Sequence, residues 1–171
     1  MLPSPVILRT NRLLLRELGT DDAPFIVELV NTPGWLKFIG ERNIRSVDQA
    51  KTYLEEGPIK SYRENGFGLW GVNLKESDTL IGMCGLLKRD ALAHPDIGYA
   101  FLPAYTGKGY AIEIAQATMD YAKTKLNITT LYAITHPENV TSIRLLGKIG
   151  MRFKEKLSFK EGEDSLLFSN E

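Results

Sequence analysis

The sequence predicts a mixed α/β fold in one compact domain. Strand-like and helix-like patterns alternate along all 171 residues, and no internal repeat, low-complexity linker or change of composition divides them. A chain of this length falls within the usual size of one domain, roughly 100–200 residues, and can bury an adequate core. We therefore expect a single domain over residues 1–171, with its core within residues 7–169.

The N-terminal part predicts one strand and two helices. In Val6–Leu18, leucines alternate with polar neighbours, as they do in a half-buried strand. Thr20 can cap a first helix, whose apolar residues recur at helical spacing until Asn31–Gly34 stops it. A capping box at Ser46 opens a second helix, and Gly57-Pro58 predicts a kink or break inside it.

The rest of the chain predicts the larger part of a sheet. Phe67–Leu74 and Thr79–Lys88 are apolar runs joined by a polar turn, which indicates an antiparallel hairpin. The next helix has the most regular amphipathic spacing in the sequence. In chain order, the remaining elements are the strand Asp96–Leu102, that helix at Gly109–Leu126, the strand Thr129–Thr135, the helix Asn139–Lys148, and a terminal hairpin of Met151–Phe159 and Ser165–Ser169 across Glu161–Asp164.

Composition argues against several classes of function. Basic and acidic side chains number 21 each, so no net charge attracts the chain to nucleic acid or membrane surfaces. The single cysteine, Cys84, excludes an intramolecular disulfide, and His94 and His136 lack a metal-binding spacing. Residues 1–5 lack a secretory pattern, and no apolar run approaches the ~20 residues of a membrane span. We expect a cytoplasmic monomer or homodimer that binds no metal, nucleic acid or membrane.

The segment from Tyr99 to Ala111 is the most informative for chemistry. A strand ends there, a turn containing Gly107 and Gly109 follows, and the most regular helix begins. Glycines let backbone N–H groups approach a ligand, and a helix N-terminus adds partial positive charge, so the junction favours an anion such as pyrophosphate. No Gly-Lys-Ser/Thr completes a P-loop, and Ile112 replaces the third glycine of a dinucleotide fingerprint. A flexible turn that only caps the helix is the alternative interpretation.

Four segments, taken together, indicate a family. They are Thr10–Arg16, Asp96–Tyr99, Thr106–Ala111 and Asn139–Met151. In that order they resemble the opening strand, the strand before the loop, the coenzyme A pyrophosphate loop and the later helix of the GNAT N-acetyltransferases. The similarity points to the branch that contains ribosomal-protein N-terminal alanine and serine acetyltransferases. Thr106 stands where the family loop often has Gln or Arg.

The resemblance implies a mostly antiparallel sheet flanked by helices, in which Asp96–Leu102 and Thr129–Thr135 splay apart around acetyl-coenzyme A. Backbone groups near Phe101 and Leu102 would hold the pantetheine arm, and one of their amides would polarise the acetyl carbonyl. The other implied contacts are Thr106, Gly107, Lys108, Gly109, Tyr110 and Ala111 at the pyrophosphate, and Asn139 and Ser142 along the arm.

The catalytic acid and base have several candidates. Ser142 could hydrogen-bond the departing sulfur, or be an ordinary first-turn helix serine. Asp96 could take the amine proton directly or through water, or bond only to backbone groups. Leu146 stands where many relatives have a tyrosine, which makes solvent a further candidate. A Ser142-His136-Asp96 triad stays open, whereas Cys84 fits a buried structural role.

The predicted function is direct transfer of an acetyl group from acetyl-coenzyme A to a primary amine. The acceptor would be a protein N-terminus, as in the ribosomal-protein branch, or a small amine. Two alternatives stand beside this hypothesis: a non-catalytic acyl-coenzyme A sensor, and a plain nucleotide-binding domain. Turnover distinguishes the first alternative, and competition between ATP and coenzyme A distinguishes the second.

Overall fold

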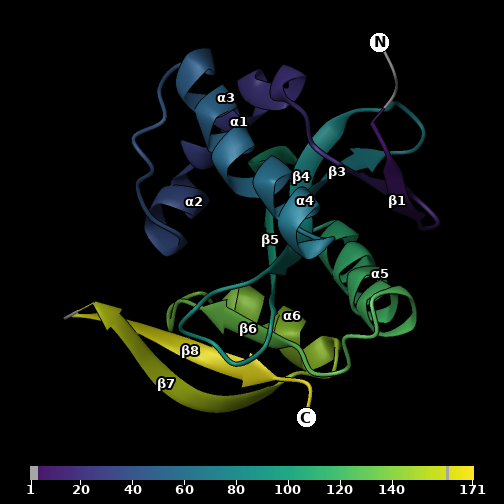
Figure 1. Ribbon diagram of the computed structural model, residues 1–171. Coiled ribbons are helices and arrows are strands. Elements are labelled where there is room, and N and C mark those ends of the chain that lie inside the picture. The colour runs from purple at the N-terminus through teal and green to yellow at the C-terminus, as the bar shows by residue number, and fades with distance from the viewer. Residues whose placement is uncertain (1–3, 161) are drawn as a thin grey trace.

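Within residues 4–160 and 162–171, which the computed structural model describes, the chain forms an eight-stranded sheet with helices on both faces (Figure 1). The strand order is β1-β2-β3-β4-β5-β6-β8-β7, and neighbours are antiparallel except β5 and β6. This confirms the predicted mixed, mostly antiparallel sheet. The strands are β1 Val6–Arg9, β2 Leu13–Arg16, β3 Leu69–Leu74, β4 Leu80–Leu87, β5 Asp96–Phe101, β6 Tyr132–Thr135, β7 Arg152–Lys160 and β8 Glu163–Ser169.

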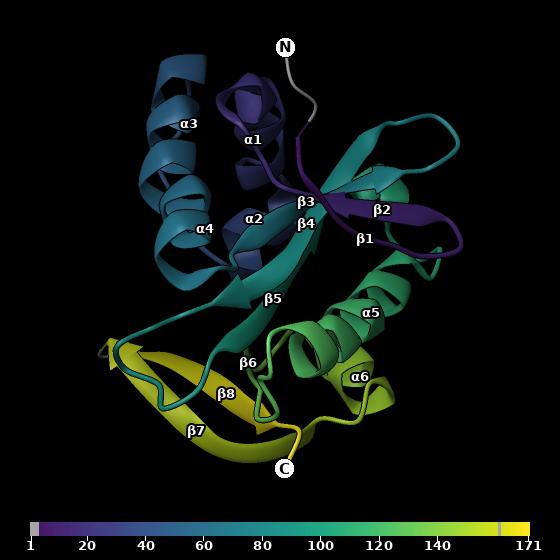
Figure 2. The same ribbon diagram turned by 45° about the vertical axis from the view of Figure 1, so that its right-hand side comes forward.

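The helices divide between the two faces of the sheet (Figure 2). An apolar cluster centred on Ile26 and Leu54 fills the first interface, and one centred on Ile114 and Leu146 fills the second. The first face carries the 3₁₀ turn η1 Thr20–Asp22, α1 Ala23–Val30, α2 Pro33–Phe38, α3 Val47–Leu54, the π-helical turn η2 Glu55–Ile59 and α4 Lys60–Asn65. The second carries α5 Tyr110–Lys125 and α6 Val140–Lys148, and the 3₁₀ turn η3 Pro103–Tyr105 precedes α5.

The N-terminal predictions need three corrections. Val6–Leu18 is not one strand, because the chain reverses after β1 and the Thr10 N–H donates to the Leu13 carbonyl. Asn31–Gly34 does not only end a helix, because Pro33 begins α2, and proline suits the first helical position, where its missing N–H costs no hydrogen bond. Thr20 does not cap α1, since it begins η1 instead.

The second helix behaves as predicted. Ser46 Oγ accepts from the Gln49 N–H at 3.2 Å, and the Gln49 side chain accepts from the Ser46 N–H at 3.1 Å, so the capping box is formed. Pro58 cannot donate a backbone hydrogen bond, and the chain accommodates it in the π-helical turn η2 between α3 and α4. In the predicted terminal hairpin β7 and β8 do pair, while Glu161 of its turn lies outside the described residues.

The central strands β5 and β6 splay apart, as predicted. They are paired only at Asp96 and Tyr132, although β5 continues to Phe101 and β6 to Thr135. Beyond the paired residues, the edge of β5 that faces β6 therefore has no neighbouring strand. A strand edge of this kind leaves backbone N–H and C=O groups available to a ligand.

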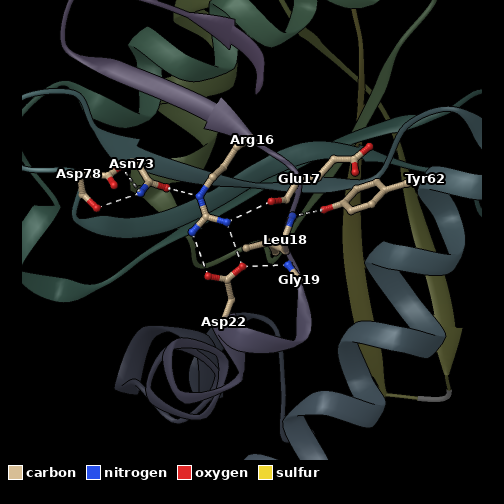
Figure 3. Close-up of polar contacts among 8 residues, drawn as sticks. All are labelled: Arg16, Glu17, Leu18, Gly19, Asp22, Tyr62, Asn73 and Asp78. Carbon is tan, nitrogen blue, oxygen red and sulfur yellow. Dashed lines mark hydrogen bonds and ion pairs between the residues drawn. The ribbon is translucent and has the colours of Figure 1, made fainter. Parts of the chain in front are cut away.

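A half-buried polar cluster fastens β2 to the helical face (Figure 3). Arg16 donates two hydrogen bonds of 2.9 Å to the Asp22 carboxylate and one of 3.1 Å to Asn73 Oδ1. Asp22 also accepts from the Gly19 N–H at 2.9 Å, and Asn73 donates to the Asp78 carbonyl at 3.0 Å. The cluster thus joins β2, η1 and the β3–β4 turn.

We expect Arg16→Ala to lower the free energy of unfolding by about 2 kcal/mol, because it leaves the Asp22 carboxylate half-buried without its guanidinium partner. Arg63→Ala, an exposed change on α4, is the matched control and should alter stability by less than about 0.5 kcal/mol. Urea denaturation of both variants measures the difference. Equal midpoints would contradict a stabilising role for the cluster.

Candidate active site

Two cavities meet at the splayed strands. The large cavity, of about 650 Å³, extends from β5 and β6 to α1, α2 and α3, and the small cavity, of about 420 Å³, lies between β5, α6 and the start of α5. Both are lined by Tyr99, Ala100, Phe101, Thr106, Asn139 and Ser142. The two cavities therefore adjoin each other along these six residues.

The glycine turn before α5 borders the small cavity. Gly107 and Gly109 have positive φ angles of 72° and 82°, a conformation that favours glycine. The first N–H groups of α5, which begins at Tyr110, have no acceptors within the helix and are free for a ligand. Thr106 Oγ1 donates to the Pro103 carbonyl at 2.8 Å, which leaves only its lone pairs for other partners, and Lys108 does not line the small cavity.

An ion-paired latch holds this turn against the start of the sheet. Glu113, in the first turn of α5, accepts from Thr10 Oγ1 at 2.6 Å and from Arg12 Nε at 2.8 Å. Arg12 also donates to the Lys108 carbonyl at 3.0 Å, and its guanidinium lies 4.4 Å above the centre of the Tyr110 ring. The segment that resembles the family's opening strand therefore fixes the conformation of the glycine turn.

The hydrogen-bond partners of Glu113 stabilise the ionised form of its carboxylate. Burial alone would raise its pKa, but the hydrogen bonds from Thr10 and Arg12 outweigh burial and hold the pKa below its ordinary value. A lowered pKa means that the stabilisation is complete at neutral pH and is lost only as the pH falls through the lowered value.

We expect Glu113→Gln to lower the free energy of unfolding by about 1–2 kcal/mol at pH 7, because it weakens a charge-assisted hydrogen-bond network. The difference from wild type should shrink below about pH 4, where the unfolded chain binds the proton more readily. Thermal unfolding at both pH values measures this, with the exposed change Glu64→Gln as control. A difference that is independent of pH would contradict the latch.

Two cations on α6 complete the small cavity. Arg144 and Lys148 are four residues apart, so they lie on one face of the helix, and both line the cavity. Among the described residues no Asp or Glu lines it. Sequence reasoning missed this pair, although its spacing after Asn139 was a usable signal. The small cavity is therefore suited to an anionic ligand.

Ser142 and Tyr99 form a hydrogen-bonded pair where the cavities meet. The Tyr99 hydroxyl lies 2.7 Å from Ser142 Oγ, with Tyr99 on β5 and Ser142 in the first turn of α6. Asn139 caps α6, because its Oδ1 accepts from the Ser142 N–H at 3.2 Å. Burial raises the pKa of the Tyr99 phenol to about 12, so the phenol keeps its proton at neutral pH. Sequence analysis did not single out this tyrosine as a site residue.

Phe101, the last residue of β5, and Leu102, which follows it, differ in whether their backbone N–H is free for a ligand. The Leu102 N–H donates to the Ile81 carbonyl at 2.9 Å, and its side chain lies in the apolar cluster beneath α1. Leu102 lines neither cavity, so its amide is not free for a ligand. Backbone direction alternates along a strand, which points the Phe101 N–H toward the open edge beside β6. Of the two residues, Phe101 is therefore the one whose backbone N–H is free to contact a ligand beside β5.

Asp96 lies at the closed end of the splay. It is 2% exposed, lines the large cavity and accepts from Arg89 Nε at 3.1 Å. Burial raises the pKa of Asp96, and Arg89 offsets part of that increase. Tyr99 lies three positions further along the strand, a rise of roughly 10 Å, so Asp96 does not belong to the Tyr99–Ser142 pair.

The Ser142-His136-Asp96 triad is wrong, because each member has a different partner. His136 Nδ1 accepts from the Glu138 N–H at 3.1 Å, Ser142 bonds to Tyr99, and Asp96 bonds to Arg89. Cys84 is fully buried on β4, and burial raises its pKa to about 12, which confirms a structural role.

Among the described residues, no helix is both long and apolar enough to cross a membrane. No group of three or more His, Cys, Asp or Glu side chains within the same residues could hold a metal ion.

A sheet split between two parallel strands, with a glycine turn and two cations on one side and a second cavity on the other, fits the acyl-coenzyme A-dependent acyltransferase class that the sequence resembles. A family model described as "Acetyltransferase (GNAT) domain" matches residues 12–152. The chain therefore belongs to the GNAT acetyltransferase family, which confirms the resemblance, and it is an acetyl-coenzyme A-dependent acetyltransferase.

Individual relatives agree with this assignment. The chain is 32% identical over 145 residues to the Bacillus subtilis (strain 168) protein called "Uncharacterized N-acetyltransferase YnaD", covering 85% of this chain and 82% of that protein. An acetyltransferase crystal structure from Agrobacterium tumefaciens superposes with a TM-score of 0.81 at 25% identity, covering 99% and 95% of the two chains. The ribosomal L7/L12 α-N-protein acetyltransferase RimL in complex with coenzyme A has a TM-score of 0.82 at 14% identity, covering 96% of each chain, and shares the fold.

Proposed function

We propose that residues 1–171 form one N-acetyltransferase domain that binds acetyl-coenzyme A in the small cavity and a primary amine in the large one. The observation that carries this proposal is the contact between the two cavities at the Tyr99–Ser142 pair. Acetyl-coenzyme A supplies the acetyl group as a thioester. In the reaction the amine nitrogen forms a bond to the acetyl carbon, the C–S bond breaks, and the amine proton passes to a base.

The proposed cofactor contacts follow the small cavity. The N–H groups of Gly107–Ala111 and the cations Arg144 and Lys148 would hold the phosphates. The free edge of β5 near Phe101, together with Asn139, would hold the pantetheine arm, and the Phe101 N–H would polarise the acetyl carbonyl. The positive φ angles at both glycines support this assignment, because a residue with a side chain would strain the backbone of the turn in this conformation.

Tyr99 and Ser142 would together donate the proton to the departing sulfur. A phenol that stays protonated at neutral pH can donate to Ser142 Oγ while Ser142 donates onward. Tyr99 would thus take the role of the tyrosine that the sequence lacks at Leu146. Asp96, roughly 10 Å from Tyr99 along β5, is the proposed acceptor of the amine proton through intervening water, and its raised pKa brings it closer to the working pH of a base.

Calorimetric titration with acetyl-coenzyme A, ATP and NAD, followed by a thiol-release assay with primary amines, tests this function. We expect acetyl-coenzyme A alone to bind at micromolar Kd, roughly −8 kcal/mol, and thiol release to require an amine. Binding without turnover for any amine, peptide N-termini included, would favour a sensor. Preferential binding of ATP or NAD would contradict the proposal. The cytoplasmic location and the monomeric or homodimeric state stay predictions from the sequence.

A further inference from the structure

The large cavity has an excess of cations. Arg42, in the loop between α2 and α3, and Lys88 and Arg89, which follow β4, all line it. Within the described part of the chain, Asp96 is the one carboxylate in the lining, and it is bonded to Arg89. Neither Arg42 nor Lys88 has an ion-pair partner among the described residues. A ligand in this cavity therefore lies beside two exposed cations that have no ion-pair partner among the described residues.

Two further side chains in the lining also offer hydrogen-bond donors. Trp35 is 6% exposed, and its Nε1–H has no hydrogen-bond partner among the described residues. A buried donor without a partner costs free energy until a ligand supplies an acceptor atom. His136 accepts at Nδ1 from the Glu138 N–H, so its neutral ring carries its hydrogen on Nε2 and can donate. Both observations are independent of the cations and favour an oxygen-bearing ligand.

The rest of the lining is largely apolar and aromatic. It includes Leu29, Phe38, Leu69, Met83 and Phe101, and these side chains offer no charge to a second amine. A volume of about 650 Å³ lies within the roughly 300–1,000 Å³ typical of small-molecule sites.

We infer that the acceptor is an α-amino acid with an apolar or aromatic side chain, whose carboxylate is bound by Arg42, Lys88 and Trp35 while its amine reaches the Tyr99–Ser142 pair. This inference rests on the proposed function, because it assigns the acceptor to the same site. A carboxylate accepts charge-assisted hydrogen bonds from the cations and satisfies the indole N–H. A polyamine such as spermidine would bring further positive charge to a cationic cavity and is disfavoured.

The test compares L-phenylalanine and L-leucine with L-phenylalaninol and L-leucinol, in which CH2OH replaces the carboxylate, and with spermidine. We expect kcat/KM to be at least about tenfold higher for each amino acid than for its alcohol. Arg42→Gln and Lys88→Gln should each reduce that ratio severalfold, because each lowers kcat/KM for the amino acid more than for its alcohol. Trp35→Phe, which keeps an aromatic ring and removes the N–H, should do the same. Arg63→Gln, which lies outside both cavities, is the control.

Direct titration of the amino acids and alcohols into the protein measures the Kd of each compound without requiring turnover. Tighter binding of the amino acids supports the inference even if transfer fails. Equal binding, absence of binding by all four compounds, or faster acetylation of an alcohol or spermidine would overturn it. Failure of acetyl-coenzyme A to bind in a separate titration would instead count against the proposed function, so the two failures are distinguishable.

Discussion

Replacement of Tyr99 by phenylalanine is expected to lower kcat for acetyl transfer by about 100-fold while the Kd for acetyl-coenzyme A stays within about twofold of wild type. The change removes one hydroxyl, which lies 2.7 Å from Ser142 Oγ, and leaves the ring in place between the cavities. Steady-state kinetics with both substrates saturating measures kcat, and calorimetry measures the affinity.

Further variants separate a proton-donating role from a structural one. Ser142→Ala should resemble Tyr99→Phe, and the double variant should be little slower than either, because residues that act as a unit are not additive. Tyr132→Phe, a buried tyrosine that lines neither cavity, should retain full activity. Since the pKa of Tyr99 is raised to about 12, loss of its proton should not reduce the wild-type rate below about pH 11. Full activity of Tyr99→Phe would show that Tyr99 is dispensable as a donor.

Gly109→Glu is expected to weaken acetyl-coenzyme A binding by about 100-fold or more. Gly109 has a φ of 82°, and a Cβ there would lie 3.3 Å from Arg12 Nη2, so the substitution strains the turn and disturbs the latch. It also places a carboxylate at the helix N-terminus where phosphates would bind. The substitution should therefore reduce the free energy of acetyl-coenzyme A binding by more than it reduces the free energy of unfolding.

Gly162→Glu is the matched control for this variant. Gly162 has a φ of 83°, and a Cβ there would meet no atom within 4 Å, so the same backbone strain and charge are introduced at a residue that lines neither cavity. Calorimetry should give wild-type affinity for this control, and circular dichroism should show both variants folded. Equal affinities for the two variants would contradict the assignment of the phosphate site.

Local sequence patterns predicted most of the sheet and the helices that follow it. The hairpin of β3 and β4 and the helix α5 depend on periodicity within one segment, and both were found as expected. The turn at Thr10–Arg12 closes through the local Thr10–Leu13 hydrogen bond, but it is also held by Glu113, more than 100 positions away, which local spacing does not encode. The helix α2 was missed because Pro33 can either end one helix or begin the next.

The parts of the site that lie within one short motif could be predicted from the sequence. The contacts between distant segments could not. Gly107 and Gly109 adopt the positive φ angles that a glycine-rich turn suggests. The pairing of Tyr99 with Ser142 joins residues 43 positions apart, and Leu102 is excluded only by the register of β5 on β4. Neither fact is encoded in local spacing, since each depends on how strands and helices pack.

A crystal structure of the complex with coenzyme A tests the central claim most directly. We predict that its sulfur lies within hydrogen-bonding distance of Ser142 Oγ, at the contact of the two cavities, and that its pyrophosphate lies on the N–H groups of Gly107–Ala111. Coenzyme A bound outside the small cavity, or with its sulfur remote from Ser142 and Tyr99, would contradict the account.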